Sequence, residues 1–377
     1  MSKVKLGEVA IEHKETCKGN KDGYPIVGLE HLVPEEVTLT AWDEGSDNTF
    51  TKMFRKGNVL FGRRRAYLKK AAVAPFDGIC SGDITVIEAI PDRILPMLLP
   101  FIIQNDELFD FAVGKSAGSL SPRVKWEHLK NYEFELPDMD KQRELAELLW
   151  AMDATKKSYQ KLIAATDELV KSQFIEMFGK PGTDPYEWGL TTLGECCKLN
   201  PRRPKDMTPD IDYSFVAMPS VSEDGRIDAS IERPYSEVCK GFTYFAENDV
   251  LFAKITPCME NGKGGVAKGL KNGAGFGSTE FHVLRPIKGA SDPYWLYIIT
   301  MFPKFRSDAE KVMTGTGGQR RVPITYLSEY RIALPPIELQ EQFAAFVRQS
   351  DKSKFELEQT LSELTATYKR IISENLG

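Results

Sequence analysis

The stretch LPDMDKQRELAELL at residues 136–149 returns, with changes, as LPPIELQEQFAAFV at residues 334–347. Both copies begin with Leu-Pro, and both carry a glutamine six residues after that leucine, at Gln142 and Gln340. A helical pattern follows each copy. Pro336 suits a first helical turn, and neither glycine nor a further proline interrupts the chain from there to Asn375. The same type of helix start therefore occurs twice in the chain, which indicates an internal duplication.

The duplication extends over the whole chain, because other short motifs recur in the same order. The matching pairs are LGE at 6–8 and 193–195, NVLF at 58–61 and DVLF at 249–252, SGDITVIEAIP at 81–91 and GSTEFHVLRPI at 277–287, and RVKWEHLKNYEFELP at 123–137 and RVPITYLSEYRIALP at 321–335. The separation grows only by small steps, as expected when loops of different length join the elements of one shared scaffold. The sequence therefore predicts two similar domains, which we call the heads.

Each head mixes predicted strands with predicted helices. ITVIEAI, FHVLRPI, YEFELP and DVLFAKI are short apolar or alternating runs typical of strands. Residues 96–112 and 293–313 have helical patterns between such runs. This mixture predicts an α+β fold and not a regular βαβ alternation.

The sequence pattern in the segments that follow the heads predicts two long helices that pair with each other. Positions 343, 347, 350, 354, 357, 361, 364, 368 and 371 alternate steps of four and three, and most of them are apolar. The first copy keeps this spacing, and Lys156 interrupts it where Lys354 interrupts the second. Such helices would be ~60 Å long at 1.5 Å per residue, which exceeds the face of one domain. We expect an antiparallel coiled coil, with residues 1–136 and 181–335 as heads and residues 137–180 and 336–377 as spacer helices, related by a pseudo-twofold axis.

Composition limits the class of protein. The 377 residues suit two or three domains, and the hydrophobic content of 42% is that of a globular protein. No membrane span or signal peptide is visible, and the six cysteines form no C-x-x-C pair, so we expect a cytoplasmic protein with reduced thiols and no metal site. The net charge of −5 does not exclude nucleic acid, because the cations cluster locally.

Motifs for catalysis are missing from the sequence. There is no Asn/Asp-Pro-Pro-aromatic motif of an adenine methyltransferase, no G-x-x-x-x-G-K-[ST] and no G-x-S-x-G. Carboxylates are too numerous for a nuclease site to be selected by spacing. We therefore expect a chain that is not an enzyme and has no catalytic residues.

Two kinds of loop at matching places in the repeat predict a nucleic-acid interface. One follows the NVLF or DVLF strand and is cationic, and the other precedes the RV…LP segment and is rich in glycine and polar residues. Glycine allows close approach to phosphates, and arginine and glutamine match base edges in the major groove. For each loop taken alone, the alternative that it is an ordinary solvent-exposed turn stays open. With a further basic cluster after residue 200, the candidate DNA-binding residues are Arg63, Arg64, Arg65, Lys69, Lys70, Lys115, Ser119, Arg123, Lys125, Arg202, Arg203, Lys254, Lys263, Lys268, Gly318, Gln319, Arg320 and Arg321.

The ordered set L-G-E, [N/D]-V-L-F, GFGSTEFHVLRP, G-T-G-G-Q-R-R-V and LPPIELQEQF resembles the specificity subunit of type I restriction–modification systems. The resemblance covers nearly the whole chain, and the second copy matches better than the first, where SGDITVIEAIP and LPDMDKQRE depart from the pattern. It implies a non-catalytic subunit for host defence whose two target-recognition domains each read one half of a split, asymmetric site in double-stranded DNA, with the helices setting the unread gap.

The resemblance also implies partners and cofactors. Two methyltransferase subunits and the restriction (helicase-nuclease) subunits would dock on this chain, with S-adenosylmethionine, ATP and Mg²⁺ on those partners and no cofactor in this chain. Two alternatives stay open: a coiled-coil scaffold with two protein-binding heads, which predicts no salt-dependent DNA binding, and a duplicated enzyme with an unrecognised carboxylate site.

Overall fold

The computed structural model describes residues 2–45 and 49–377, and the chain divides into two compact units. Unit 1 comprises residues 1–161 with 357–377, and unit 2 comprises residues 162–356. Each unit contains one predicted head together with parts of both long helices. The predicted boundaries between heads and spacers stay a prediction, because this division falls inside the helices and not at their ends.

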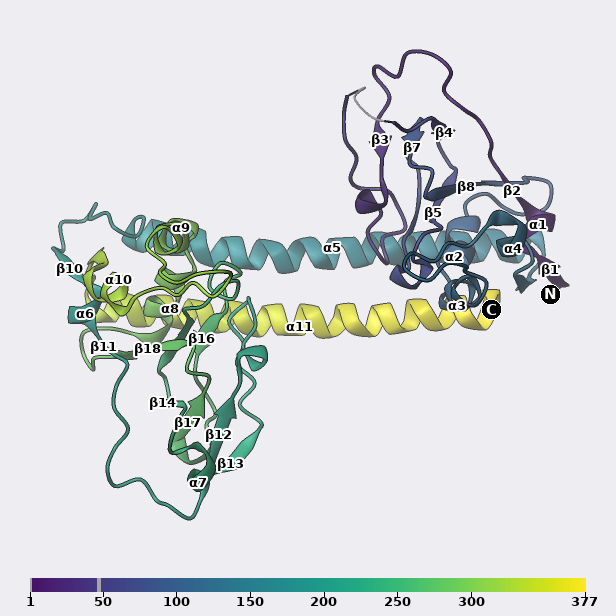
Figure 1. The fold of residues 1–377 in the computed structure, drawn as a ribbon. Coiled ribbons are helices and arrows are strands. Elements are labelled where there is room, and N and C mark those ends of the chain that lie inside the picture. The colour runs from purple at the N-terminus through teal and green to yellow at the C-terminus, as the bar shows by residue number, and fades with distance from the viewer. Residues whose placement is uncertain (1, 46–48) are drawn as a thin grey trace. The chain divides into compact units, whose positions relative to one another are not determined.

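The described residues of unit 1 form three small sheets, and Figure 1 shows several of their strands in purple and blue. One sheet has the strand order β2-β8-β5-β6, the second has the order β3-β7-β4, and the third pairs β1 with β9. Their bounds are β1 Ser2–Lys5, β2 Ala10–Glu12, β3 Ile26–Val27, β4 Lys52–Phe54, β5 Val59–Gly62, β6 Ala71–Val73, β7 Gly78–Cys80, β8 Ile84–Ala89 and β9 Glu133–Leu136.

Unit 2 repeats this topology with one additional strand. Its sheets have the orders β11-β18-β15-β16, β13-β12-β17-β14 and β10-β19, and β13 has no counterpart strand among the described residues of unit 1. The bounds are β10 Leu190–Thr192, β11 Cys197–Leu199, β12 Asp212–Val216, β13 Glu232–Pro234, β14 Thr243–Ala246, β15 Val250–Ala253, β16 Gly264–Val266, β17 Ala274–Gly277, β18 Phe281–Pro286 and β19 Arg331–Ala333. The predicted duplication and the α+β class are confirmed.

The helical segment predicted in each head is two helices and not one. Unit 1 has α2 Leu99–Ile103 and α3 Asp106–Gly114, and unit 2 has α8 Pro293–Met301 and α9 Pro303–Lys311. Asn105 starts α3 by accepting a hydrogen bond from Glu107 N, and Pro303 occupies the first position of α9. A side-chain cap and a proline are both signals for a new helix start, so each segment breaks at that point. Short helices complete the heads: α1 Leu6–Val9, α4 Trp126–Leu129, α6 Leu193–Cys196, α7 Tyr235–Val238 and α10 Ile324–Glu329.

The repeated glutamine anchors the start of each long helix, α5 Met139–Phe178 and α11 Ile337–Leu376. Gln142 is 2% exposed, accepts from Leu95 N at 2.8 Å and donates to Pro137 O at 2.9 Å. Gln340 is fully buried, accepts from Asp292 N at 2.9 Å and donates to Ala290 O and Pro335 O. The side-chain amide therefore satisfies backbone groups that would otherwise be buried without partners, which explains why the sequence repeats it.

The long helices pack against each other within each unit. In unit 1 the early part of α5, with Leu145 and Leu149, shares a core with the last turns of α11, with Ile372 and Leu376. In unit 2 the late part of α5 meets the early part of α11, where the rings of Phe174 and Phe343 lie 5.4 Å apart. Early residues of one helix meet late residues of the other in both units, so the pairing is antiparallel as predicted.

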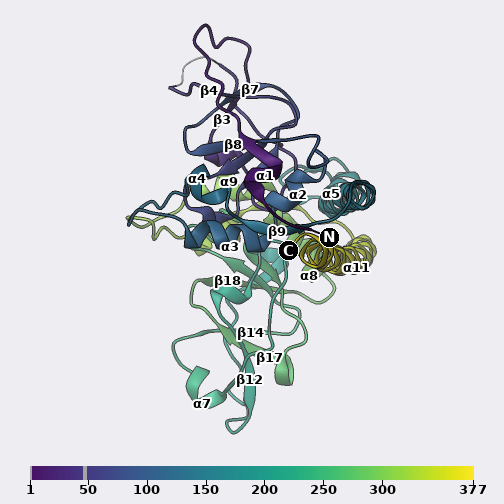
Figure 2. The ribbon, with the colours of Figure 1, turned by 90° about the vertical axis from the view of Figure 1, so that its right-hand side faces the viewer.

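Both chain ends belong to unit 1, and Figure 2 shows them near β9. Ser2 pairs with Leu136 across β1 and β9, and Glu135 N donates to Gly377 O at 3.3 Å. All six cysteines are free. Among the described residues, no helix is long and apolar enough to cross a membrane.

Candidate nucleic-acid interface

The two candidate loops of unit 1 are joined to each other by their backbones. Val124 N donates to Arg63 O at 3.0 Å, and Arg65 N donates to Pro122 O at 2.8 Å, with Arg64 opposite Arg123 in an antiparallel bridge. The loop after β5 and the loop before α4 therefore form one surface. The sequence placed candidate residues on both loops, but only the structure shows that they are one feature.

Unit 2 joins its two loops in the same way. Val322 N donates to Lys254 O at 2.9 Å, Thr256 N donates to Arg320 O at 3.0 Å, and Ile255 bridges Arg321. Each bond matches one in unit 1 at the equivalent position of the repeat. We call the joined pair of loops in each unit the loop pair: residues 61–74 with 114–125 in unit 1, and residues 252–269 with 314–323 in unit 2.

An arginine–carboxylate ion pair reinforces each loop pair. In unit 1 Arg123 Nε lies 2.7 Å from Asp83 Oδ1, and Arg64 lies 3.3 Å from the other oxygen. In unit 2 Arg321 Nη2 lies 2.8 Å from Glu280 Oε1. Arg123 lowers the pKa of Asp83, and Arg321 lowers that of Glu280, because each guanidinium hydrogen-bonds the charged carboxylate. Three of the candidate arginines thus hold the loops in place through a carboxylate.

Other candidates on the first loop of unit 1 divide into paired and unpaired cations. Lys69 pairs with Asp106 at 2.6 Å, and Lys70 donates to Leu29 O at 2.7 Å. The Nε of Arg63 is buried without a hydrogen-bond partner among the described residues. Arg65 is exposed, has a left-handed backbone with φ 54°, and has no side-chain partner in the described part of the chain. Of these four, Arg65 is the cation most available to a phosphate.

The second loop of unit 1 presents small and cationic residues to solvent. Ser119 and Lys125 are exposed, and Lys115 lies over the Phe111 ring at 5.7 Å from its centre. Leu120 is 90% exposed, the largest exposed fraction given for any large hydrophobic residue described. Sequence reasoning missed Leu120, although an apolar residue between serines in a glycine-rich loop is a signal for an exposed contact.

The loop pair of unit 2 is more polar. Gly318 and Gln319 are exposed, and Arg320 lies 3.5 Å from Glu260 and 3.6 Å from Glu310. Lys263 donates to Met218 O at 3.4 Å, and Lys254 is half-buried. Lys268 lies over the Tyr294 ring at 4.5 Å, close to α8. Three of these four cations therefore already contact other parts of unit 2.

Two buried residues that the sequence did not single out support the loop pair of unit 2. Arg306 of α9 is 8% exposed and donates to Met259 O and, at 3.1 Å, to Gly262 O. His282 is 5% exposed, between Asn200 at 3.2 Å and Val322 O at 2.8 Å. Burial lowers the pKa of His282 to about 4, so the ring is neutral at pH 7 and donates to one neighbour while accepting from the other.

The last predicted cluster follows β11. Arg203 contacts Tyr235 through its guanidinium, which lies 5.5 Å from the ring centre. Arg202 is exposed and has no side-chain partner among the described residues. No group of three or more His, Cys, Asp or Glu side chains in residues 2–45 and 49–377 is arranged to hold a metal ion.

Comparisons with known proteins agree with this geometry. The model of the type I restriction modification DNA specificity domain matches residues 1–165 and 185–365, once for each repeat. The chain is 42% identical over 160 residues to the Type I restriction enzyme EcoEI specificity subunit of Escherichia coli, over 42% of this chain and 26% of the relative. It is 37% identical over 202 residues to the EcoAI specificity subunit of the same species, over 52% of this chain and 34% of the relative. The matches thus span about a third or less of these relatives.

Solved structures share the fold over nearly the whole chain. One is a chain from a study of complex assembly and conformational transition of the type I R-M system, with a TM-score of 0.58, 21% identity, and coverage of 99% of this chain and 97% of that one. Another is the type I restriction-modification system S subunit from M. genitalium, with a TM-score of 0.57, 12% identity, and coverage of 100% and 96%. At these identities the likeness is one of fold.

Proposed function

We propose a function from one premise: the chain belongs to the family of type I restriction modification DNA specificity domains. The chain acts as the DNA specificity subunit of a type I restriction–modification complex. Each unit reads one half of a bipartite, asymmetric target in double-stranded DNA. The chain itself is not catalytic, works in the cytoplasm, and brings methyltransferase and restriction subunits to the site that it reads.

The observation that carries the proposal is the loop pair, which occurs once in each unit with the same backbone bonds. Val124 and Val322 make equivalent bonds to the loops after β5 and β15. The side chains on the two loop pairs differ: the first presents Arg65 and Leu120, and the second presents Gly318 and Gln319. One scaffold with different exposed side chains suits the reading of two different half-sites, because base edges are distinguished by side-chain type.

Partner subunits complete the proposal. S-adenosylmethionine, ATP and Mg²⁺ belong to those partners, and this chain needs no cofactor. Support for partner subunits comes from the relatives, which are specificity subunits of type I restriction enzymes.

The exchange of one head tests the proposal directly. Strands β10 and β19 pair at the base of the unit 2 head, so cuts at residues 186 and 335 keep both strands in the exchanged segment. Replacing residues 186–335 with the segment of a relative should change one half of the methylated motif in cells that carry the partner subunits, read by mapping methylated adenines. Exchange of residues 1–136 should change the other half. A change in both halves, or in neither, would contradict one half-site per unit.

Salt dependence separates the proposal from a protein-binding scaffold. Contacts to phosphates release counterions, so the affinity for DNA should fall steeply and linearly in log–log form as salt rises. DNA binding that is absent or insensitive to salt would favour the scaffold.

A further inference from the structure

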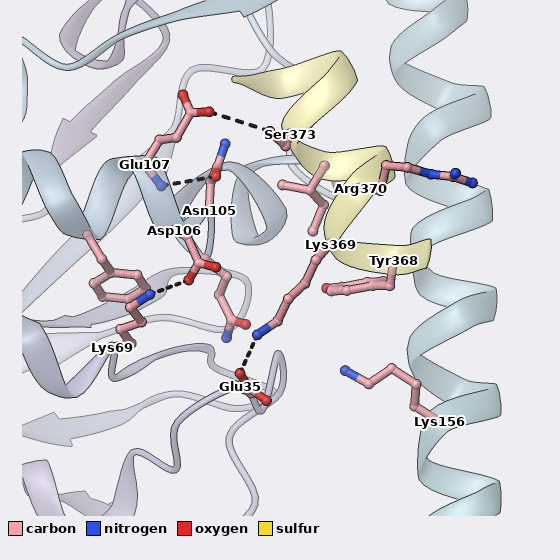
Figure 3. A pocket seen from close by; sticks show the side chains of 13 residues that line it. Glu35, Lys69, Asn105, Asp106, Glu107, Lys156, Tyr368, Lys369, Arg370 and Ser373 are labelled. Atoms are coloured by element: carbon pink, nitrogen blue, oxygen red, sulfur yellow. Dashed lines mark hydrogen bonds and ion pairs between the residues drawn. The ribbon is translucent and has the colours of Figure 1, made fainter. Parts of the chain in front are cut away.

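Unit 1 contains a cavity of about 300 Å³ beside the last turns of α11, and Figure 3 shows its lining. Side chains reach it from α3, from α11, from Lys156 of α5 and from the loops that carry Glu35 and Lys69. Sequence analysis singled out Lys156 only as an interruption of the helix seam, and the loop pair does not use it.

Two nearly buried polar side chains of this cavity have no polar partner in the part of the chain that the structure describes. Lys156 is 7% exposed, and its ammonium makes neither a hydrogen bond nor an ion pair in the described part of the chain. It lies 4.6 Å from the centre of the Tyr368 ring. Tyr368 is 5% exposed, and its hydroxyl has no hydrogen-bond partner among residues 2–45 and 49–377. An unpaired charge and an unpaired hydroxyl at one place are both costly, so a ligand that satisfies them would bind favourably.

The described carboxylates around Lys156 each have another partner, a cation for three of them and a hydroxyl for the fourth. Glu35 pairs with Lys369 at 2.6 Å, as Figure 3 shows, and Asp153 pairs with Lys157 at 2.8 Å. Asp106 pairs with Lys69, and Glu107 accepts from Ser373 at the other end of the cavity. Among the described residues of unit 1, Lys156 therefore has no ion-pair partner.

The duplicated copy shows what such a lysine needs. Lys354 of unit 2 is the counterpart of Lys156, since both lie 14 residues after the anchoring glutamines of the repeat, and it is also 7% exposed. Its ammonium lies 2.8 Å and 3.0 Å from the two carboxylate oxygens of Asp167 and 3.6 Å from Asp224. Unit 2 thus neutralises the buried lysine with its own carboxylates.

Unit 1 replaces that carboxylate with groups that donate. By the same repeat spacing, the position of Asp167 on α5 corresponds to Thr365 on α11, and the position of Val170 corresponds to Tyr368. The lysine keeps its place, loses its internal acceptor and gains a phenol beside it. Burial raises the pKa of Tyr368, and the charges of Asp153 and Glu35 raise it further, so the hydroxyl stays protonated and can donate.

We propose that the cavity binds a small oxyanion of the phosphate or carboxylate class. Lys156 supplies the cation, and the Tyr368 hydroxyl supplies a hydrogen bond to an anion oxygen. Charge-assisted hydrogen bonds of this kind are stronger than neutral ones, and lysine serves phosphate as a point charge. An anion bound there contacts α5 and α11 together, so it would stabilise the end of α11 within unit 1 by mass action.

Calorimetric titration of the full chain with inorganic phosphate tests this, with acetate as the carboxylate probe and chloride at equal ionic strength as the reference. Saturable binding of phosphate or acetate is expected, and whichever binds more tightly identifies the preferred class. Lys156→Met should lower the affinity on the order of 100-fold, and Tyr368→Phe about 10-fold, as expected for the loss of hydrogen bonds to a charged group. Lys354→Met, the same change in unit 2, should leave the affinity unchanged.

If Lys156→Met folds poorly, a variant that adds a carboxylate partner for Lys156 provides a second test. Thr365→Asp gives unit 1 the carboxylate that unit 2 has, so it should raise the melting temperature of the chain in chloride and abolish phosphate binding. Hydrogen exchange should also slow on phosphate addition in residues 357–377 and not in residues 337–356. Absence of saturable binding, or equal affinity in the parent chain, Lys156→Met and Thr365→Asp, would overturn the proposal.

Discussion

The two units support the same strand with different side chains. In unit 1 Asn58, 5% exposed, accepts from Arg55 N at 2.8 Å just before β5. In unit 2 Asp249, 1% exposed, accepts from Ala246 N at 2.7 Å just before β15, and it also binds both arms of Arg285 at 2.8 Å and 2.7 Å. Both units thus have a side-chain acceptor just before this strand. Either a neutral amide or a carboxylate paired with an arginine can provide it.

The neighbouring position has changed to match. The counterpart of Arg285 in unit 1 is Glu88, which binds His13 at 2.7 Å. A buried carboxylate is tolerated where a guanidinium is supplied and is replaced by an amide where it is not. The two units therefore differ in how much each depends on electrostatics.

The largest expected effect comes from removing the charged acceptor, Asp249. Asp249→Ala should destabilise unit 2 by about 3 kcal/mol, because it leaves Arg285 partly buried without its carboxylate. Asn58→Ala should cost unit 1 about 1 kcal/mol, the value of an ordinary buried hydrogen bond. Chemical denaturation gives the totals, and hydrogen exchange in β15 and β18, against β5 and β8, assigns each loss to its unit. Equal losses in the two variants would contradict the comparison.

A smaller and equal effect is expected where the units agree. Gln142→Leu and Gln340→Leu should each cost about 2 kcal/mol, since each leaves one buried backbone N–H without an acceptor at the start of a long helix. The N–H groups belong to Leu95 and Asp292. Their exchange rates are the direct measurement, with an unchanged rate at Leu95 in Gln340→Leu as the control. If only one of the two variants lost stability, the glutamine of the other unit would not have this structural role.

The ion pairs of the loop pairs should give a still smaller effect that depends on pH. Arg321 lowers the pKa of Glu280 below its ordinary value of 4.5, so the pair stabilises the folded state above that value. This stability is lost as the pH falls through the lowered pKa. The difference in unfolding free energy between the parent chain and Glu280→Gln should therefore be constant near neutral pH, shrink below pH 4.5 and vanish below the lowered pKa.

Asp83→Asn in unit 1 sharpens this comparison. The ordinary pKa of Asp83 is 3.8, and Arg123 and Arg64 lower it, so the loss of its stabilisation should begin at a lower pH than for Glu280, whose ordinary pKa is 4.5. Denaturation curves between pH 3 and pH 7 measure both windows. A difference for Glu280→Gln that grows on acidification would have the wrong sign for this ion pair.

The sequence predicted the architecture well because the repeat shows it twice. The strands at 84–89 and 281–286, the long helices, and the seam at Leu145 and Phe343 all follow from hydrophobic spacing, which local sequence encodes. The break at Asn105 was missed because a capping asparagine within an apolar run is a weak signal.

The details of the site depend on contacts that lie far apart in the sequence. The contact between Arg123 and Asp83 and the hydrogen bond between His282 and Val322 form only when the sheets are in place. Several residues predicted as contacts from their charge also pair within their unit, as Lys69 does with Asp106. Clusters of cations in the sequence do not show which of them are neutralised.

The smallest expected effect separates a free cation from a paired one on the same loop pair. Arg65 is exposed without a partner among the described residues, whereas Arg123 is paired with Asp83. If Arg65 contacts a DNA phosphate, Arg65→Gln should reduce the slope of log affinity against log salt by about 0.9. That corresponds to roughly a three-fold change in affinity across a four-fold range of salt.

Arg123→Gln provides the contrast, measured with the same DNA and the same salt series. Because Arg123 already neutralises Asp83, its loss should weaken binding through the position of the loop and leave the slope unchanged. The two slopes decide between contact and positioning, since only a released counterion changes the slope. A reduced slope in Arg123→Gln with an unchanged slope in Arg65→Gln would reverse the roles assigned to these two arginines.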